Sequence, residues 1–240
     1  MAFNYTTRRL RFPVLWLRRV YDLEIPPRKK GEVLRFLYGL ERWRPRKPLE
    51  RDGYIYLWLK ESTMADILGL PRPDDASTAG ARRVRRRRLL KRLGEVVDSL
   101  SEAMKSFGGM LLDIERIGES NWFCIRLHRS WLARPYVLVP LYTSDKCRPP
   151  RNPLDFLLLF AVGLEAGRRH KGWAVVKVSE LERLTGLKGR SLRAVRARLR
   201  RLGILVESPW PKDGRFIAMR LATPEEAMDK WISNLGSEGK

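Results

Sequence analysis

The sequence predicts an α+β protein with two tandem winged helix-turn-helix domains, mainly helical with small antiparallel β-wings. Three observations lead to this prediction. Hydrophobic residues recur at helical spacing in several segments of each half. Short alternating segments bounded by turn residues follow the last helix of each half. The order of these elements is the same in both halves, and 240 residues suffice for two domains with their own cores.

The C-terminal half shows this order more clearly. Helices are expected at 153–170, 179–186 and 190–202, and strands at 173–178, 204–207 and 216–221. Ser179 is expected to cap the second helix, with Glu182 completing a capping box and Gly186 ending the helix. A short turn joins it to the third helix, and the loop 208–214 between the last two strands is the predicted wing.

The N-terminal half repeats the order with longer pieces. Helices are expected at 30–43, 62–68 and 82–107, and strands at 54–59, 110–117 and 122–127. Ser62 is the expected cap of the short middle helix, which Gly69 ends. The agreement lies in element order, because the two halves share little direct identity.

Prolines set the expected domain boundaries. The segment 133–153 contains five prolines and is predicted to be a linker, with 136–141 as an extended stretch. The domains are therefore expected at 29–132 and 154–240, the second ending in a helix at 224–232 capped by Thr223. Residues 1–28 are treated as an N-terminal arm that no pattern places.

The chain is strongly basic throughout. Its 49 Lys and Arg residues and 27 Asp and Glu residues give a formal net charge of +22. Residues 1–140 contribute +13 and residues 141–240 contribute +9, so both halves are cationic. A nucleic acid is the favoured partner, and an anionic lipid surface or simple solubility are the alternatives.

The predicted helix 190–202 separates apolar from basic residues. Leu192, Val195, Leu199 and Leu202 form one stripe at about 100° per residue. Seven basic residues and no acid lie between 188 and 201, so intrahelical ion pairs cannot relieve the repulsion. Small and forked basic side chains suit the major groove, whereas a solvated face is the alternative. The residues expected to contact DNA are Lys188, Arg190, Ser191, Arg193, Ala194, Arg200 and Arg201.

The predicted helix 82–107 has an arginine-rich start. Its core stripe begins only at Leu89, so the preceding two turns are expected to protrude toward DNA. The arginines that should contact DNA there are Arg82, Arg83, Arg85, Arg86, Arg87 and Arg88. A frayed, solvated extension is the alternative. In the wing, Lys212 and Arg215 are expected to follow a phosphate strand or the minor groove.

Several other classes of site have no signal in the sequence. Two cysteines, Cys124 and Cys147, and two histidines, His128 and His170, make no recognisable metal site, and no cofactor is expected. No phosphate-binding loop ending in Lys-Ser or Lys-Thr is present, so we expect no enzymatic activity. No stretch predicts a membrane helix or signal peptide, and a cytoplasmic location is expected.

The composition also bears on the source of the chain. Glutamine is absent and asparagine occurs four times, a depletion that is reported for thermophiles. A thermophilic origin is thus a hypothesis, and arginine-rich codon usage is its alternative.

The predicted order over about 29–222 resembles the iteron-binding plasmid replication initiators (Rep family) with tandem winged-helix domains. The segments that carry the resemblance are 179–186 with 190–193, and 82–88 with the long helix after it. The resemblance implies that two winged helices grip successive major grooves of repeated origin DNA, and that the C-terminal helix makes the main specific contacts. It further implies origin opening, recruitment of host replication helicase machinery, and homodimers formed through the N-terminal domain.

Two other functions fit the same patterns. A winged-helix transcriptional regulator would bind a promoter palindrome, and a non-specific architectural protein would bind unrelated duplexes equally well.

Overall fold

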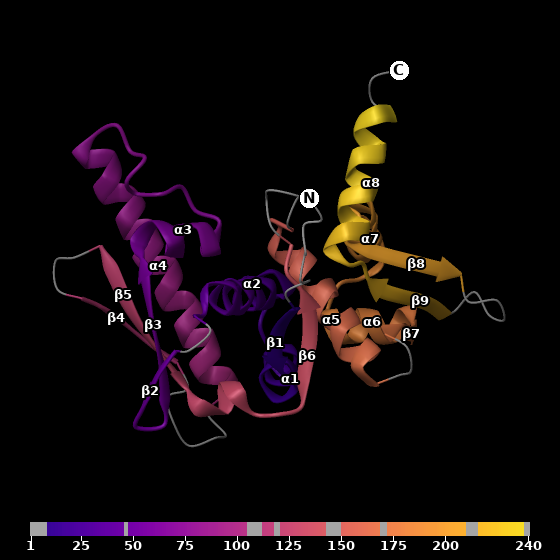
Figure 1. Cartoon of the computed structure of the whole chain (residues 1–240), viewed down its shortest axis with the longest axis horizontal. Coiled ribbons are helices and arrows are strands. Elements are labelled where there is room, and N and C mark those ends of the chain that lie inside the picture. Colours follow the sequence, from indigo (N-terminus) through magenta and orange to yellow (C-terminus); the bar gives the residue numbers. More distant parts are fainter. Residues whose placement is uncertain are drawn as a thin grey trace, which may run out of the picture.

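The structure, a computed structural model, describes residues 9–45, 48–104, 112–117, 121–142, 150–168, 172–209 and 216–237. They form a mixed α+β fold with small antiparallel sheets (Figure 1). The helices are α1 (Val14–Asp22), α2 (Pro27–Trp43), α3 (Glu61–Leu68), α4 (Ala79–Met104), the 3-10 helix η2 (Arg129–Leu132), α5 (Pro153–Arg168), α6 (Val178–Thr185), α7 (Gly189–Arg201) and α8 (Pro224–Ser237). The strands are β1 (Arg9–Pro13), β2 (Leu49–Arg51), β3 (Tyr54–Lys60), β4 (Leu112–Arg116), β5 (Trp122–His128), β6 (Tyr136–Pro140), β7 (Ala174–Lys177), β8 (Leu205–Pro209) and β9 (Phe216–Leu221).

The N-terminal half is built on a four-stranded antiparallel sheet in the order β2-β3-β5-β4. Alternate residues of β3 and β5, such as Leu57 and Ile125, are buried, which gives the sheet one apolar face. Leu93 and Val96 of α4 belong to the same buried cluster. The predicted long helix and its two following strands are therefore present, and β2 is an additional strand that the sequence analysis missed.

The C-terminal half has a three-stranded antiparallel sheet in the order β7-β9-β8. The helices α5, α6 and α7 pack with it around Leu158, Leu181 and Leu199, which are all buried. The predicted order of elements is confirmed here, and β9 has the predicted bounds.

Residues 9–28 are not a separate arm. β1 pairs antiparallel with β6, so Leu10 lies opposite Val139 and both side chains are buried. α1 follows directly and buries Trp16 and Leu17. This segment packs against the rest of the chain because its apolar side chains are buried in the core. In addition, β6, which lies within the predicted linker, forms the hydrogen bonds that the backbone of β1 requires. Only the extended stretch within that linker was predicted correctly.

The two halves share one continuous hydrophobic core. α2 and α5 approach so closely that a methyl group on Gly31 would overlap the carbonyl oxygen of Pro153. The Tyr21 hydroxyl donates to the carbonyl of Leu157 over 2.5 Å, which ties the end of α1 to α5. In the intact chain these contacts fix the relative orientation of the two halves.

Two predicted helix caps, Ser62 and Ser179, are each wrong by two residues. α3 begins at Glu61 after Lys60 rather than at Ser62, and its N-cap makes no side-chain hydrogen bond. α6 begins at Val178, and Glu180 rather than Glu182 accepts a hydrogen bond from the cap residue. In both cases the helix starts directly after a strand, so the last strand residue takes the cap position.

The cap of α8 agrees with the prediction. The Thr223 hydroxyl accepts from the amide of Glu226, whose carboxylate accepts from the amide of Thr223 in return. None of the described helices is both long and apolar enough to cross a bilayer.

Candidate nucleic-acid interface

The turn between α6 and α7 is held by buried and local hydrogen bonds. Gly186 ends α6 with a positive φ of 69°, and the buried Thr185 hydroxyl accepts from the amide of Leu187 over 3.2 Å. The carboxylate of Glu182 accepts from the amide of Gly189, the first residue of α7, over 2.7 Å. An acid at a helix N-terminus pairs with backbone donors that lack helical partners. Glu182 therefore fixes the start of α7 relative to α6.

α7 presents its predicted polar face to solvent. Leu192, Val195 and Leu199 are buried, as the apolar stripe requires. The seven residues expected to contact DNA are all exposed: Lys188, Arg190, Ser191, Arg193, Ala194, Arg200 and Arg201. The sequence therefore identified this surface correctly as an exposed basic helix face.

Acids from other elements reach the second half of α7, which local sequence did not predict. Glu207 of β8 accepts from Arg196 over 2.7 Å and lies 3.3 Å from a guanidinium nitrogen of Arg200. Asp155 of α5 accepts from Arg198 over 2.7 Å. Burial raises the pKa of Asp155, while the hydrogen bond from Arg198 acts in the opposite direction. Arg200 is thus partly neutralised, and it is a weaker candidate than the sequence suggested.

The start of α7 keeps its positive charge. Within the part of the chain that the structure describes, Lys188, Arg190 and Arg193 have no ion-pair partner. Their side chains are exposed and occupy the end of α7 nearest to α6. An anion that approaches this end meets three cations, while the Glu182 carboxylate already binds an amide at the positive end of the helix dipole.

In α4, the six predicted arginines divide into two groups. Arg82, Arg83, Arg87 and Arg88 are exposed and have no ion-pair partner among the described residues. Arg85 and Arg86 are half-buried.

Arg86 is a correction to the predicted DNA contacts. Its guanidinium donates twice to the carboxylate of Glu61, over 2.7 and 2.9 Å, and once to the side chain of Asn121 over 2.9 Å. The hydrogen bonds to Glu61 raise the pKa of Arg86. Glu61 is buried, so Arg86 compensates a carboxylate that would otherwise be desolvated alone. The available signal was that Arg86 falls at the angle of the core stripe, where a basic residue requires an acidic partner.

Arg85 is likewise tied to the protein. It donates to the carbonyl of Arg72 over 3.0 Å, and Arg72 forms two hydrogen bonds with Asp66. These contacts anchor the loop between α3 and α4 to the arginine-rich start of α4. Arg85 therefore shapes this end of the helix instead of remaining free for DNA.

The wing residues Lys212 and Arg215 lie outside the described residues. The strands on either side, β8 and β9, pair antiparallel from Leu205 opposite Leu221 to Pro209 opposite Ile217.

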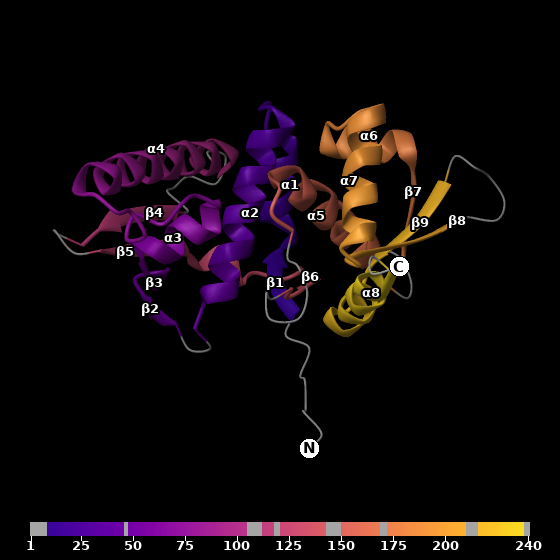
Figure 2. The same ribbon diagram turned by 90° about the horizontal axis from the view of Figure 1, so that it is seen from above.

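α4 and α7 reach the same side of the molecule. Figure 2 shows α4 running along the upper edge and α7 beginning at that edge next to α6. α4 lies lengthwise there, whereas α7 points its first turn outward. Both helices can thus be reached from one side of the molecule.

The sequence matches no protein-family model and no curated protein.

Among the described residues, no group of three or more His, Cys, Asp or Glu side chains could hold a metal ion. Cys124 is a free thiol whose pKa is raised by burial, and Cys147 and His170 lie outside the described residues. The charge and geometry of the helices are therefore the basis for a functional proposal.

Proposed function

We propose that the chain is a sequence-specific double-stranded-DNA-binding protein without catalytic activity, built of two tandem winged-helix domains. Apart from the additional strand β2, the element order α2-β3-α3-α4-β4-β5 recurs as α5-β7-α6-α7-β8-β9, which supports this fold. The observation that carries the function is that α4 and the start of α7, which both carry exposed basic side chains, reach the same edge of the molecule (Figure 2). A duplex is the polyanion whose grooves accept such helices.

We further propose that the target is a set of origin repeats, as in the iteron-binding initiators that the sequence resembles. The protein would bind repeats, promote opening of the adjacent origin DNA, and use host replication helicase machinery as its motor. α7 would make the base contacts, because its first turn points outward with small residues between its basic ones.

Affinity and specificity can be tested together by titrating labelled duplexes with the full chain. If about 6 to 10 phosphates are neutralised, affinity falls roughly a thousand- to a hundred-thousand-fold between 50 and 200 mM salt. Arg193→Ala or Arg190→Ala lowers discrimination between target and unrelated DNA by about 1 to 3 kcal/mol, if the lost contact is a bidentate base contact. A flat salt response, or equal discrimination after both substitutions, contradicts the proposal.

Footprinting on the replicon that encodes the chain separates the role of initiator from its rivals. Protection of tandem direct repeats with a melted region beside them supports an initiator. A single protected promoter palindrome supports a transcriptional regulator. Uniform protection supports a non-specific architectural protein.

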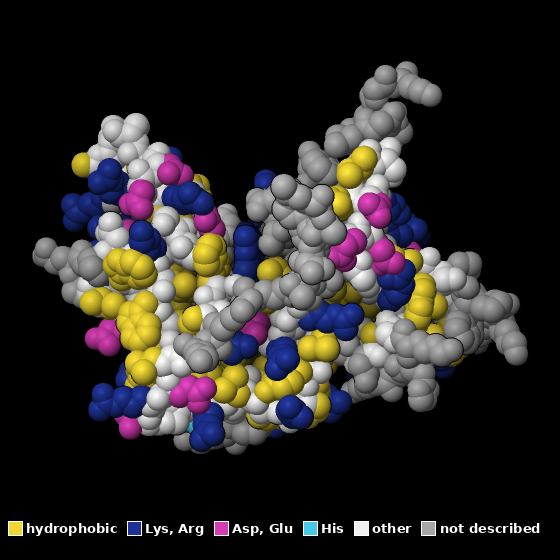
Figure 3. Space-filling model, viewed as in Figure 1, with side chains coloured by type: hydrophobic (Ala, Val, Ile, Leu, Met, Phe, Trp, Pro, Cys, Tyr) yellow, Lys and Arg dark blue, Asp and Glu magenta, His cyan; other side chains and the backbone are white. Residues whose placement is uncertain are grey.

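The outer face of the N-terminal sheet suits a second copy of the chain. Hydrophobic side chains gather over this sheet in Figure 3. Tyr56 and Trp58 stack with ring centroids 6.1 Å apart, and Trp58 and Leu49 are exposed. Arg126 pairs with Asp113 on the same face, so two copies could approach there with less repulsion than elsewhere on this basic chain. We propose this face as the homodimer interface, and Trp58→Ala should shift sedimentation from dimer to monomer.

A further inference from the structure

The end of α1, the following turn and the first turn of α2 form an element that we call the elbow, residues 18–30. Residues 18–28 of the elbow belong to the segment that the sequence could not place. In Figure 2, α1 and α2 lie between α4 and α6, toward the same upper edge. The elbow is therefore positioned between α4 on one side and α6 with α7 on the other.

The elbow touches both halves. On the C-terminal side, Pro27 packs against the turn between α6 and α7, so that a methyl group on Gly186 would lie 3.0 Å from the Cγ of Pro27. Arg18 and Arg183 of α6 also line one shared hollow. Hence the elbow stands directly beside the base of α7.

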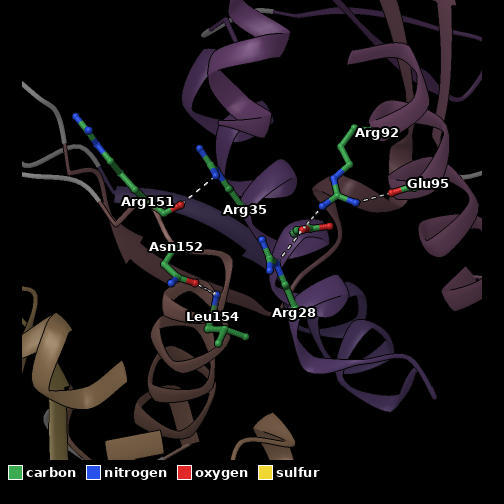
Figure 4. Close-up of polar contacts among 8 residues, drawn as sticks. Arg28, Arg35, Arg92, Glu95, Arg151, Asn152 and Leu154 are labelled. Atoms are coloured by element: carbon green, nitrogen blue, oxygen red, sulfur yellow. Dashed lines mark hydrogen bonds and ion pairs between the residues drawn. The ribbon is translucent and has the colours of Figure 1, made fainter. Parts of the chain in front are cut away.

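On the N-terminal side, an ion-pair network joins the elbow to α4. Arg92 of α4 binds Glu32 of α2 and Glu95 over 2.6 Å each (Figure 4). The hydrogen bond from Arg92 also lowers the pKa of Glu95. Arg28 shares Glu32 at a longer distance, 3.7 Å. Because Glu32 pairs more closely with Arg92, Arg28 is only weakly paired and can bind another anion.

Two side chains of the elbow are exposed and basic at the start of α2. The side chain of Arg28 is 75% exposed, and Lys29 is exposed as well. Lys30 differs, because its ammonium donates to the carbonyl of Tyr21 over 2.5 Å and burial lowers its pKa. Lys30 thus links the start of α2 to the end of α1, whereas Arg28 and Lys29 are exposed to solvent.

Acids at the elbow limit its net charge. Asp22 and Glu24 are exposed near the same turn. The hollow that Asp22 lines with Arg18 and Arg183 is also lined by Glu165 and Glu180, so acidic side chains outnumber basic ones there. The positive end of the 17-residue α2 adds to Arg28 and Lys29. The favourable site is thus the first turn of α2 rather than the elbow as a whole.

We infer that Arg28 and Lys29 bind the phosphate backbone of the duplex between the two grooves that α4 and α7 enter. This inference rests on the proposed function. When two helices enter successive major grooves on one face of a duplex, the intervening minor groove and its phosphates pass between them. The elbow occupies that position and presents two unpaired or weakly paired cations. Such contacts set register and affinity but not base preference.

The double variant Arg28→Ala/Lys29→Ala tests this in the full chain. Two lost phosphate contacts reduce the slope of log affinity against log salt by about 1.8, since each contributes about 0.9. Between 50 and 200 mM salt, the ratio of wild-type to variant affinity should therefore fall roughly 12-fold. The ratio of target to unrelated affinity should stay unchanged. Both residues are exposed, and circular dichroism checks that the fold is retained.

Arg51→Ala is the matched control, because Arg51 is equally exposed and ends β2, a strand that lies near the opposite edge in Figure 2. It should leave the salt slope at the wild-type value. A double variant with the wild-type slope, measured alongside an Arg193→Ala variant that loses discrimination, overturns the elbow contact alone. Absence of duplex binding by the wild-type chain overturns both the elbow contact and the proposed function.

Discussion

Replacing Arg86 by alanine should destabilise the fold without weakening the DNA surface. The substitution removes two hydrogen bonds to Glu61 and one to Asn121. The remaining Glu61 carboxylate is 1% exposed, so it would stay buried without its counter-charge. Arg87→Ala, one residue along on the exposed side of α4, is the matched comparison.

The magnitude follows from the burial of the two partners. Breaking a fully buried ion pair costs about 3 to 5 kcal/mol, whereas an exposed pair contributes about 0 to 1 kcal/mol. The side chain of Arg86 is 29% exposed, so water can reach the vacated position and reduce the cost. We expect a loss of about 2 to 3 kcal/mol in the free energy of unfolding, or roughly 4 to 12 °C in Tm for a chain of this size.

Urea unfolding followed by circular dichroism measures the stability, and duplex titration well below both melting temperatures measures the affinity. Arg86→Ala should show the stability loss with near wild-type affinity. Arg87→Ala should show the reverse, with a salt slope reduced by about 1. Equal stability of the two variants, or an equal loss of affinity, would refute the assignment of Arg86 to the fold.

Two further predictions concern packing and pH. Gly31→Ala should lower the free energy of unfolding by about 1 to 3 kcal/mol, measured by urea unfolding, because the new methyl group meets the backbone of Pro153; wild-type stability would contradict the close approach of α2 and α5. Glu226→Gln should cost about 0.5 to 1 kcal/mol at neutral pH, because Glu226 caps α8 and pairs with Arg220 while partly exposed to solvent. The hydrogen bonds from Arg220 lower the pKa of Glu226, so this contribution is present above the unfolded pKa and disappears as pH falls through the folded pKa. Wild-type and variant unfolding curves should thus converge at acid pH, and a constant difference would argue against the pair.

The parts of the fold that the sequence predicted are those encoded locally. The stripe of Leu192, Val195 and Leu199 is repeated every three or four residues, so periodicity alone separates the buried face of α7 from its basic face. The alternation in residues 216–221 likewise predicted β9. Both patterns depend only on neighbours within one element.

The parts that the sequence did not predict depend on distant partners. β1 is held by β6, which follows it by more than a hundred residues. Arg86 has its acid 25 residues earlier, and Arg196 has its acid 11 residues later on another element. A count of charges within one helix cannot detect such pairs, so the sequence overestimated the number of arginines available to DNA.

These long-range pairs also explain how one chain can present two separate basic helices to a single duplex. An arginine cluster repels itself, and Glu61 and Glu207 relieve that repulsion by pairing with the half-buried Arg86 of α4 and Arg196 of α7. Among the described residues, the unpaired charge is left at exposed positions of the same helices, such as Arg87 and Arg193. Because α2 and α5 lock the halves together, the second helix meets its groove with little further loss of rotational freedom. The same rigidity makes the elbow an integral part of the surface, since a duplex that contacts both helices has to pass over it.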